Sequence, residues 1–447
     1  MADRLRTLAV KNIKLNVMER IIMSSLMRWK ESTHRKPLIL LGARQTGKTY
    51  ILKEFGKRAY EKVAYVNFDN NEELQNLFTL DYDIPRILTV ISAIAGIKIE
   101  PGNTLIILDE IQEVPRGIGS LKYFCEDAPE YHVVVAGSLL GITMHHGESF
   151  PVGKVNFLRM YPMNFEEFLL AKGKEILVEK MKSRDWPMIN ALSNTLTHHL
   201  REYYLTGGMP AAVEEYVSSG DIGAVREIQN EIIDGYSRDI SKHAPTAEVP
   251  RILLVWNSIT SQLAKENKKF VYGALKKGAR AKEFELAIQW LIDAGLVYKI
   301  SRVKNVQMPL KIYEDFESFK LFMNDIGLMA AMANVPAADI LLGKSMNNFK
   351  GAFTENYVAT QLKTMPDLGI YYYSREDSRL EIDFVVQKDS DIIPIEVKAE
   401  ENLKSKSLHS LVSANPGMKG LRLSMSGYRD QEWMENVPLY AMHLAFS

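Results

Sequence analysis

The sequence has almost no cysteine, no net charge and no long hydrophobic run. Its one cysteine, Cys125, cannot form a disulfide within the chain, which fits a reducing compartment. Lysine plus arginine and aspartate plus glutamate number 55 each, so net charge favours neither nucleic acid nor a membrane as partner. Apolar runs such as Leu38–Leu41 are far shorter than the ~20 residues of a membrane-spanning helix. Because the N-terminus also lacks a signal-peptide core, we expect a cytoplasmic protein without a membrane partner.

What the sequence does contain is the composition of a multidomain globular protein. Its 447 residues, 46% of them hydrophobic and 25% charged, exceed what one core holds. Up to about residue 160, strand-length apolar runs alternate with helix-competent stretches, which predicts an α/β layer with a mainly parallel sheet. Helical patterns dominate from Phe165 to Ala264, and a small α/β region begins near Gly351. The expected strands are Leu38–Leu41, Val63–Phe68, Leu105–Leu108, Val133–Ala136 and Val155–Leu158.

A glycine-rich loop follows the first apolar run and leads into a helical pattern at Tyr50–Phe55. It fits G-x-x-x-x-G-K-[ST] without a mismatch, and its backbone N–H groups are expected to surround phosphate oxygens at the positive end of the new helix. Lys48 would contact the β- and γ-phosphates, and the Thr49 hydroxyl would bind Mg²⁺. The pattern predicts ATP and Mg²⁺ as ligands, the alternative being a plain strand-to-helix turn. The loop residues are Gly42, Ala43, Arg44, Gln45, Thr46, Gly47, Lys48 and Thr49.

Two later strand ends carry polar side chains. The run Leu105–Leu108 ends in Asp109 and Glu110, the order expected of a Walker-B strand. Asp109 would support the magnesium ion at one remove, and Glu110 would polarise the attacking water as a general base. Ser138 follows the run Val133–Ala136, where it would sense the γ-phosphate or hold that water. Taken alone, each pattern is also compatible with an ordinary solvated turn.

These segments, together with the run Tyr161-Pro162-Met163-Asn164-Phe165-Glu166-Glu167-Phe168, resemble the AAA+-type ATPase domain of a large family of prokaryotic ATPases. The likeness covers residues from about Met27 to Phe168. It implies a sheet in which the P-loop strand is flanked by the Walker-B and sensor strands. Relatives commonly have an arginine finger, for which Arg116 and Arg159 are candidates, although surface arginines are usually only solvated.

The middle of the chain has a weaker signal. Residues 251–302 have the pattern of three helices and a hairpin, and this order is similar to a winged-helix fold. Its basic side chains would then face nucleic-acid phosphates. A solvated helix face is the preferred interpretation, because Glu283 and Glu285 interrupt the basic run. The basic residues are Lys276, Lys277, Arg280 and Lys282.

Near the C-terminus, two alternating strands carry a second group of charged residues. If Asp389-Ser390 is a two-residue hairpin loop, Asp383 lies opposite Glu396, on the face that also carries Lys398. Facing carboxylates repel unless a cation lies between them, which favours a second divalent metal, Mg²⁺ or Mn²⁺. Glu355, an acid on an apolar helical stripe, also requires a partner, and the same metal is a candidate.

This D-x₁₂-E-x-K arrangement resembles the PD-(D/E)XK nuclease superfamily over roughly residues 350–399. The resemblance implies that Asp383 and Glu396 hold the metal, with Glu355 as the helix acid, and that Lys398 assists phosphodiester hydrolysis. Ile382 stands where the superfamily usually has proline. A salt-bridged hairpin, or nuclease geometry without activity, are the alternatives.

The sequence thus predicts an α/β multidomain protein with three parts. Residues 1–200 would form the ATPase domain, residues 201–345 a helical region with the winged-helix-like module, and residues 346–447 the nuclease-like domain. One hypothesis is a Mg²⁺-dependent ATPase that controls a nuclease-like domain acting on DNA or RNA. The alternative is a nucleotide-dependent switch with an inactive nuclease-like module, in which ATP changes homo-oligomer assembly or affinity for a protein partner. A protein-remodelling motor has less support, because no substrate-handling loop is recognisable.

Overall fold

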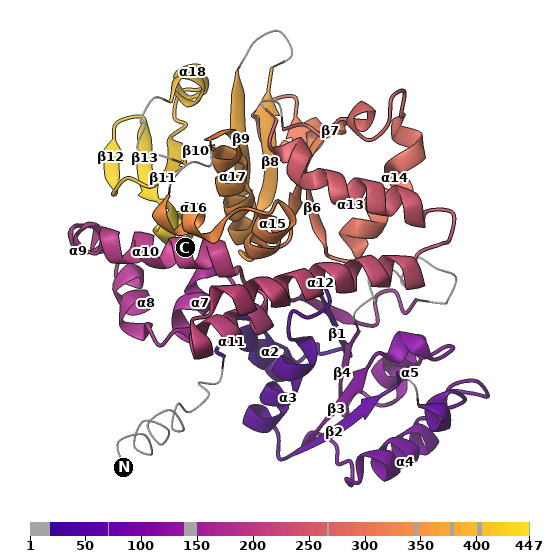
Figure 1. Cartoon of the computed structure of the whole chain (residues 1–447). Helices are drawn as coiled ribbons and strands as arrows, with labels where there is room; N and C mark the ends of the chain where they lie inside the picture. Colours follow the sequence, from indigo (N-terminus) through magenta and orange to yellow (C-terminus); the bar gives the residue numbers. More distant parts are fainter. Residues whose placement is uncertain are drawn as a thin grey trace, which may run out of the picture.

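The computed structural model describes residues 18–69, 71–137, 150–265, 268–343, 347–375, 380–399 and 405–446. These residues form a five-stranded and an eight-stranded sheet, with the helices α7 to α12 between them (Figure 1). We call them the N-terminal sheet, β1 to β5, and the C-terminal sheet, β6 to β13. In the part of the chain that is described, no helix has the length and apolarity required to cross a membrane.

The N-terminal sheet is entirely parallel and has the order β2-β3-β4-β1-β5. The five apolar runs of the sequence all form strands, as predicted. One expectation is wrong: the P-loop strand β1 lies between β4 and β5, and β4 separates it from the Walker-B strand β3. The strands are β1 Leu38–Leu41, β2 Lys62–Asn67, β3 Thr104–Asp109, β4 His132–Ala136 and β5 Asn156–Arg159.

Alternation along β1 builds two hydrophobic cores. Ile39 and Leu41 pack into the core on one face of the sheet, and Leu38 and Leu40 into the core on the other. Because both faces are covered by helices, the strand is apolar throughout, as parallel strands usually are. The covering helices are α2 Ile22–Glu31, α3 Lys48–Ala59, α4 Ile84–Ala95 and α5 Ser120–Asp127.

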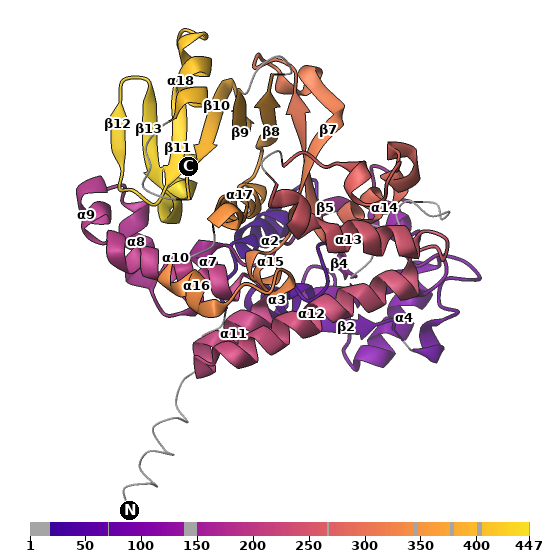
Figure 2. The same cartoon turned by 45° about the horizontal axis from the view of Figure 1, so that its top comes forward.

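The helical middle begins directly after β5, and its helices lie where the sequence placed helical patterns. Its longest helix, α12, lies beside α15 (Ile326–Met332) in both views (Figures 1 and 2). The helices are α7 Phe165–Ala171, α8 Glu175–Lys182, α9 Trp186–Ala191, α10 Ser193–Thr206, α11 Pro210–Ser219, α12 Ile222–His243 and α13 Val249–Leu263.

Gly207 and Gly208 lie between α10 and α11, where other parts of the chain approach them closely. The N–H of Gly208 donates to the Asp325 carboxylate at 2.6 Å, and its carbonyl accepts from Met163 N at 2.7 Å. A Cβ on Gly208 would lie 2.0 Å from the Met163 carbonyl oxygen. Burial raises the pKa of Asp325 to about 6, while N–H donors from Gly208, Leu328 and Gly327 oppose that rise.

The variant Gly208→Ala is therefore expected to be less stable by about 2–4 kcal/mol, because backbone rather than a flexible side chain must move. Gly273→Ala is the matched control, since a Cβ at that position would have no neighbouring atom within 4 Å. Thermal unfolding midpoints measure both effects. A Gly208→Ala midpoint equal to that of the control would contradict the close approach.

Residues 251–302 differ from the predicted pattern of three helices and a hairpin. Among the described residues of 251–302, the α-helices are α13 and α14 (Ala281–Asp293), with a 3₁₀ turn at Tyr272–Ala274 between them. Lys276 and Lys277 lie in the exposed loop before α14, so the basic residues do not share one recognition helix. The predicted hairpin does form, from β6 Val297–Val303 and β7 Glu314–Met323, but β6 also pairs with β8 and joins the C-terminal sheet.

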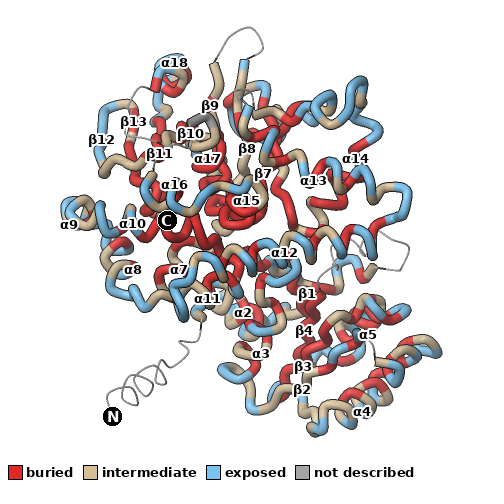
Figure 3. The backbone as a smooth tube through the Cα atoms, in the orientation of Figure 1, coloured by how far each residue is buried: buried red, intermediate tan, exposed pale blue. Residues whose placement is uncertain are grey.

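The C-terminal sheet is mixed and has the order β12-β13-β11-β10-β9-β8-β6-β7, so it runs across the expected boundary at residue 345. Figure 3 shows that α15 and α17, which lie against this sheet, are mostly buried. The elements are α15 Ile326–Met332, α16 Ala337–Leu342, α17 Asn347–Lys363, β8 Gly369–Ser374, β9 Glu381–Lys388, β10 Asp391–Val397, α18 Lys406–Ser413, β11 Gly420–Ser424, β12 Arg429–Gln431 and β13 Met434–Pro438.

Candidate nucleotide-binding site

The glycine-rich loop lies at the carboxyl end of β1 and leads directly into α3. Gly47 has φ 90° and Gln45 φ 65°, so the chain curls through left-handed positions before the helix begins. The Lys48 ammonium folds back over this curl and donates to the carbonyls of Gly42 and Ala43, each at 2.8 Å. A nucleotide's phosphates would offer this cation a stronger, charged partner than two neutral carbonyls.

The Walker-B aspartate faces the loop across the sheet edge. Asp109 is buried, and its Oδ2 accepts from the Thr49 hydroxyl at 2.8 Å and from the Tyr65 hydroxyl at 3.0 Å. Burial raises the pKa of Asp109, and these two hydrogen bonds oppose the rise. A hydroxyl beside a buried carboxylate is a donor set that suits Mg²⁺, so Thr49 and Asp109 fit the predicted ion.

Glu110 follows Asp109 in a left-handed conformation with φ 54°, which is uncommon for a residue with a side chain. Its N–H donates to the Ala136 carbonyl at 2.7 Å, and its carboxylate accepts from the Gln112 amide. The two acids are therefore turned to different surroundings: Asp109 toward Thr49 and Glu110 toward Gln112. Ser138, the predicted sensor, lies outside the described residues.

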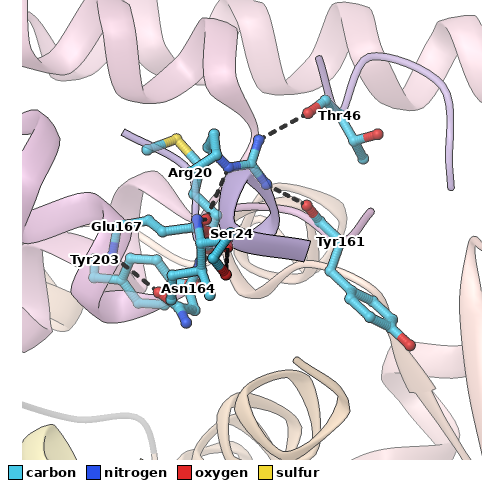
Figure 4. Close-up of polar contacts among 9 residues, drawn as sticks. Arg20, Ser24, Thr46, Tyr161, Asn164, Glu167 and Tyr203 are labelled. Carbon is cyan, nitrogen blue, oxygen red and sulfur yellow. Dashed lines mark hydrogen bonds and ion pairs between the residues drawn. The ribbon is translucent and has the colours of Figure 1, made fainter. Parts of the chain in front are cut away.

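A buried arginine that the sequence analysis did not identify, Arg20, forms a hydrogen bond with the backbone of the P-loop. Figure 4 shows the Arg20 guanidinium between the P-loop and α7, where it donates to Thr46 O at 3.0 Å, Tyr161 O at 2.6 Å and the Glu167 carboxylate at 3.0 Å. Glu167 also closes a capping box with Asn164 at the start of α7. The run 161–168 therefore ties α2, α7 and the loop together.

The tip of the loop contacts α12. Arg44 forms an ion pair with Asp239, and its carbonyl accepts from the Tyr236 hydroxyl at 2.9 Å. Gly295, just after α14, also lies close, since a Cβ there would be 3.1 Å from Ala43 N. The helical middle thus contacts the residues that would surround the phosphates.

Nucleotide affinity is expected to depend on pH through Lys48. Burial, with Arg44 nearby, lowers the pKa of Lys48 to about 8, although Glu110 and Asp109 oppose the shift. Bound phosphates favour the charged form, so binding takes up a proton above pH 8 and affinity falls by up to about tenfold per pH unit there.

Calorimetric titration of ATP between pH 7.5 and 9.5 measures this dependence. Lys48→Arg keeps its charge throughout and should give a flat profile over the same range. A wild-type profile as flat as that of Lys48→Arg would contradict the lowered pKa.

The two arginine-finger candidates lie in different surroundings. The Arg116 guanidinium donates to Thr79 O at 2.7 Å and to the Tyr82 hydroxyl at 3.2 Å, which holds it against its own domain. Arg159 ends β5 and lines a groove between α2 and α17.

In the C-terminal sheet the predicted hairpin register is found. Asp391 pairs with Lys388 and Ile395 with Phe384, and the same register continued by one residue sets Asp383 opposite Glu396. Lys398 Nζ lies 2.6 Å from Glu396 Oε1, and Asp383 Oδ2 accepts from Val397 N at 2.8 Å.

The partners of Glu355 are lysines that the sequence analysis did not connect with it. Lys268 pairs with Glu355, and Lys320 Nζ, on β7, lies 3.8 Å from its Oε2 and 2.6 Å from Glu381 Oε1. Burial raises the pKa of Glu355, and the negative charge of Asp383 raises it further. The positive charges of Lys268 and Lys320 oppose this rise. Within the described ranges, no group of three or more His, Cys, Asp or Glu side chains is arranged to hold a metal ion.

Three stretches of the chain match known families. Residues 34–169 match the family described as AAA domain. Residues 197–339 and 350–443 match two further families, each described as a domain of unknown function (DUF8612 and DUF4143). No curated protein matches the chain.

Several solved structures are similar at low identity. The Walker-type ATPase Paby2304 of Pyrococcus abyssi has 15% identity and TM-score 0.45, covering 71% of this chain and 96% of its own. The ORC1 protein of Aeropyrum pernix in complex with DNA has 14% identity and TM-score 0.30, with 74% and 97% covered. The RuvB Holliday junction branch migration motor of Thermotoga maritima has 12% identity and TM-score 0.29, with 65% and 89% covered. The family match identifies residues 34–169 as an AAA domain, and the P-loop and the parallel sheet lie within it.

Proposed function

We propose that this chain binds ATP with Mg²⁺ at residues 42–49 and hydrolyses it. The observation that carries the proposal is the meeting of Lys48, Thr49 and Asp109 at one edge of the N-terminal sheet, with Glu110 next in the chain. Lys48 would bind the terminal phosphates, and Thr49 with Asp109 would hold the ion. When bound, Mg²⁺ would offset negative charge on the phosphates.

Glu110 is the proposed general base. Its carboxylate would accept a proton from the water that attacks the γ-phosphate, and Ser138 would orient that water or the phosphate. The hydrogen bond from Gln112 limits the directions in which the Glu110 carboxylate can turn.

The direct test is phosphate release by the purified full-length chain with ATP, with Mg²⁺ and with EDTA. Magnesium-dependent release that follows protein concentration supports the proposal. The proposal would be refuted if the chain neither bound ATP nor released phosphate in the presence of Mg²⁺.

We also propose that nucleotide binding changes the conformation of the helical middle. This change is common to the two hypotheses, the ATPase that controls a nuclease-like domain and the nucleotide-dependent switch. The contacts run from Arg44 to α12, from α12 to α15, and from α15 to α17, which carries Glu355. Phosphates beside Arg44 would compete with Asp239 for its guanidinium and weaken the hold of α12.

Amide hydrogen exchange in residues 222–243 tests this coupling. Exchange should change with MgATP in wild type and stay constant in Lys48→Ala. Light scattering of the same samples tests the switch alternative, in which ATP changes homo-oligomer assembly or affinity for a protein partner. Equal exchange with and without ATP in wild type would contradict the coupling.

A second candidate function is metal-dependent cleavage of DNA or RNA at the C-terminal sheet. It is favoured by the hairpin register and by the ion pair between Lys398 and Glu396. A further observation is that Oε2 of Glu355 and Oε2 of Glu396 are buried and have no hydrogen bond among the described residues. Asp383 and Glu396 would hold Mg²⁺ or Mn²⁺, with Glu355 as the helix acid. Lys268 and Lys320 oppose this function, because they already offset the charge of Glu355.

Incubation with DNA and RNA, Mn²⁺ or Mg²⁺, and ATP decides between these functions. Cleavage by wild type that is lost in Lys398→Ala and kept in the exposed control Lys406→Ala supports the nuclease. Absence of cleavage under every condition leaves the C-terminal domain as a binding module of the switch.

A further inference from the structure

A groove of about 620 Å³ separates α2 and the end of β5 from the turn between α17 and β8. We call it the α2–α17 groove. Its walls come from residues 20–28, 158–167 and 362–370, so parts of the AAA-type domain face part of the C-terminal domain across it. Its volume lies within the range of small-molecule sites, which often form between domains.

The groove has more positive charge than its own carboxylates can offset. Arg28, Arg159 and Lys363 line it, and no carboxylate among the described residues pairs with any of them. Two acids also line it: Glu167 is already bound by Arg20, and Asp367 lies on the exposed turn. The unpaired cations therefore exceed the available acid by two.

Two of the cations, Arg159 and Lys363, line the same groove and repel each other electrostatically. Burial lowers the pKa of Lys363, and the nearby positive charge of Arg159 lowers it further. An anion between them would offset both charges, and phosphate does so with several oxygens at once.

Much of the remaining wall is apolar, beside polar side chains such as Ser24, Asn164 and Thr364, and its apolar part suits a flat ring. Ile22, Leu158 and Met160 stand on one side, and Pro366, Leu368 and Ile370 on the other. Cations beside apolar side chains in a groove of this size fit a ligand that combines phosphate with a planar apolar part.

We propose that the α2–α17 groove binds a nucleoside phosphate at a site distinct from the P-loop, with Arg159 and Lys363 on its phosphates and the apolar walls against its base. Arg28, which is exposed at the rim, adds attraction for the same anion. The site does not require that the P-loop hydrolyse ATP.

Arg20 connects the groove with the loop. Arg20 lines the groove, and its guanidinium donates to Thr46 O at 3.0 Å (Figure 4). A ligand seated against Arg20 would therefore touch the residue that positions the P-loop, so occupancy of the groove is expected to alter ATP affinity.

The test is the stoichiometry of ADP binding to the full-length chain, measured by equilibrium dialysis with Mg²⁺. Wild type should bind two ADP per chain. Lys48→Ala should retain the groove site, and Arg159→Gln/Lys363→Gln should retain the P-loop site. Combining the three substitutions should weaken the remaining binding at least tenfold.

Matched controls separate the groove from general charge loss. Lys276→Gln/Lys277→Gln removes two exposed cations far along the chain and should leave both sites intact. Inorganic pyrophosphate and AMP in place of ADP separate the phosphate contribution from that of the base. Circular dichroism of each variant verifies folding, and Arg28→Gln, at the exposed rim, provides a milder variant if the double substitution fails to fold.

Three results would overturn the proposal. One is a single ADP per chain that Lys48→Ala abolishes, which would make the groove no site or part of the P-loop site. Another is a second ADP that survives Arg159→Gln/Lys363→Gln. The third is binding of a 20-nucleotide single strand that needs Arg159 and Lys363 while ADP and AMP do not bind, which would assign the groove to nucleic acid.

Discussion

Lys48→Ala is expected to weaken ATP binding to the P-loop by about 100-fold or more, about 3 kcal/mol. The reason is the burial of the ammonium, which is largely withdrawn from water and donates to the carbonyls of Gly42 and Ala43. Those carbonyls are weak partners for a cation, so most of its interaction free energy becomes available when phosphates arrive. Calorimetric titration with ATP and Mg²⁺ measures the loss.

Lys57→Ala is the matched control on the same helix. Lys57 is exposed and pairs with Glu54 at 2.6 Å, so its removal should leave affinity unchanged. Equal thermal midpoints for the two variants would show that the loss is local. Unchanged ATP affinity at the P-loop in Lys48→Ala would remove the basis of the proposed function.

The parts of this site that could be predicted from sequence are those set by short-range pattern. A strand, a glycine-rich turn and a helix follow one another at residues 38–59, so motif and geometry coincide. The hairpin register at Asp389-Ser390 was predictable for the same reason, because a two-residue loop fixes which residues face each other.

The contacts that could not be predicted join segments far apart in the chain. Asp239 and Tyr236 reach Arg44 across 195 and 192 residues, and no local pattern on α12 marks them. The predicted strand order of the N-terminal sheet was wrong for a similar reason. Sequence motifs mark where strands end, but they do not determine which strands are neighbours. Glu167 differs from these contacts: Asn164-x-x-Glu167 has the spacing of a capping box, a local signal of a helix start that the sequence analysis did not use.

The contacts of Lys268 and Lys320 in the C-terminal sheet also could not be predicted from local sequence pattern. The alternation of β9 and β10 predicted facing acids, and a metal was the natural partner for them. The lysines arrive from the loop before residue 270 and from β7, a strand whose place in this sheet depends on the parallel pairing of β6 with β8. A charge on one strand can thus be offset by a segment that sequence analysis assigns to another domain.

The second large effect is expected for Glu110→Gln, which should bind MgATP as tightly as wild type and hydrolyse it about 10²–10³-fold more slowly. The amide keeps the size of the side chain and still offers an oxygen to Gln112, so the turn after β3 should persist. It cannot accept a proton from water. Phosphate release under single-turnover conditions, beside an ATP titration, separates the two effects.

Glu113→Gln is the control for this change, because Glu113 lies three residues along the same turn and is exposed. It should keep wild-type rates. If Glu110→Gln also kept them, the base would be another group, and the left-handed backbone at Glu110, with φ 54°, would serve only to end β3. If binding were lost together with hydrolysis, Glu110 would act in holding the ion, the role that the hydrogen bond from Thr49 favours for Asp109.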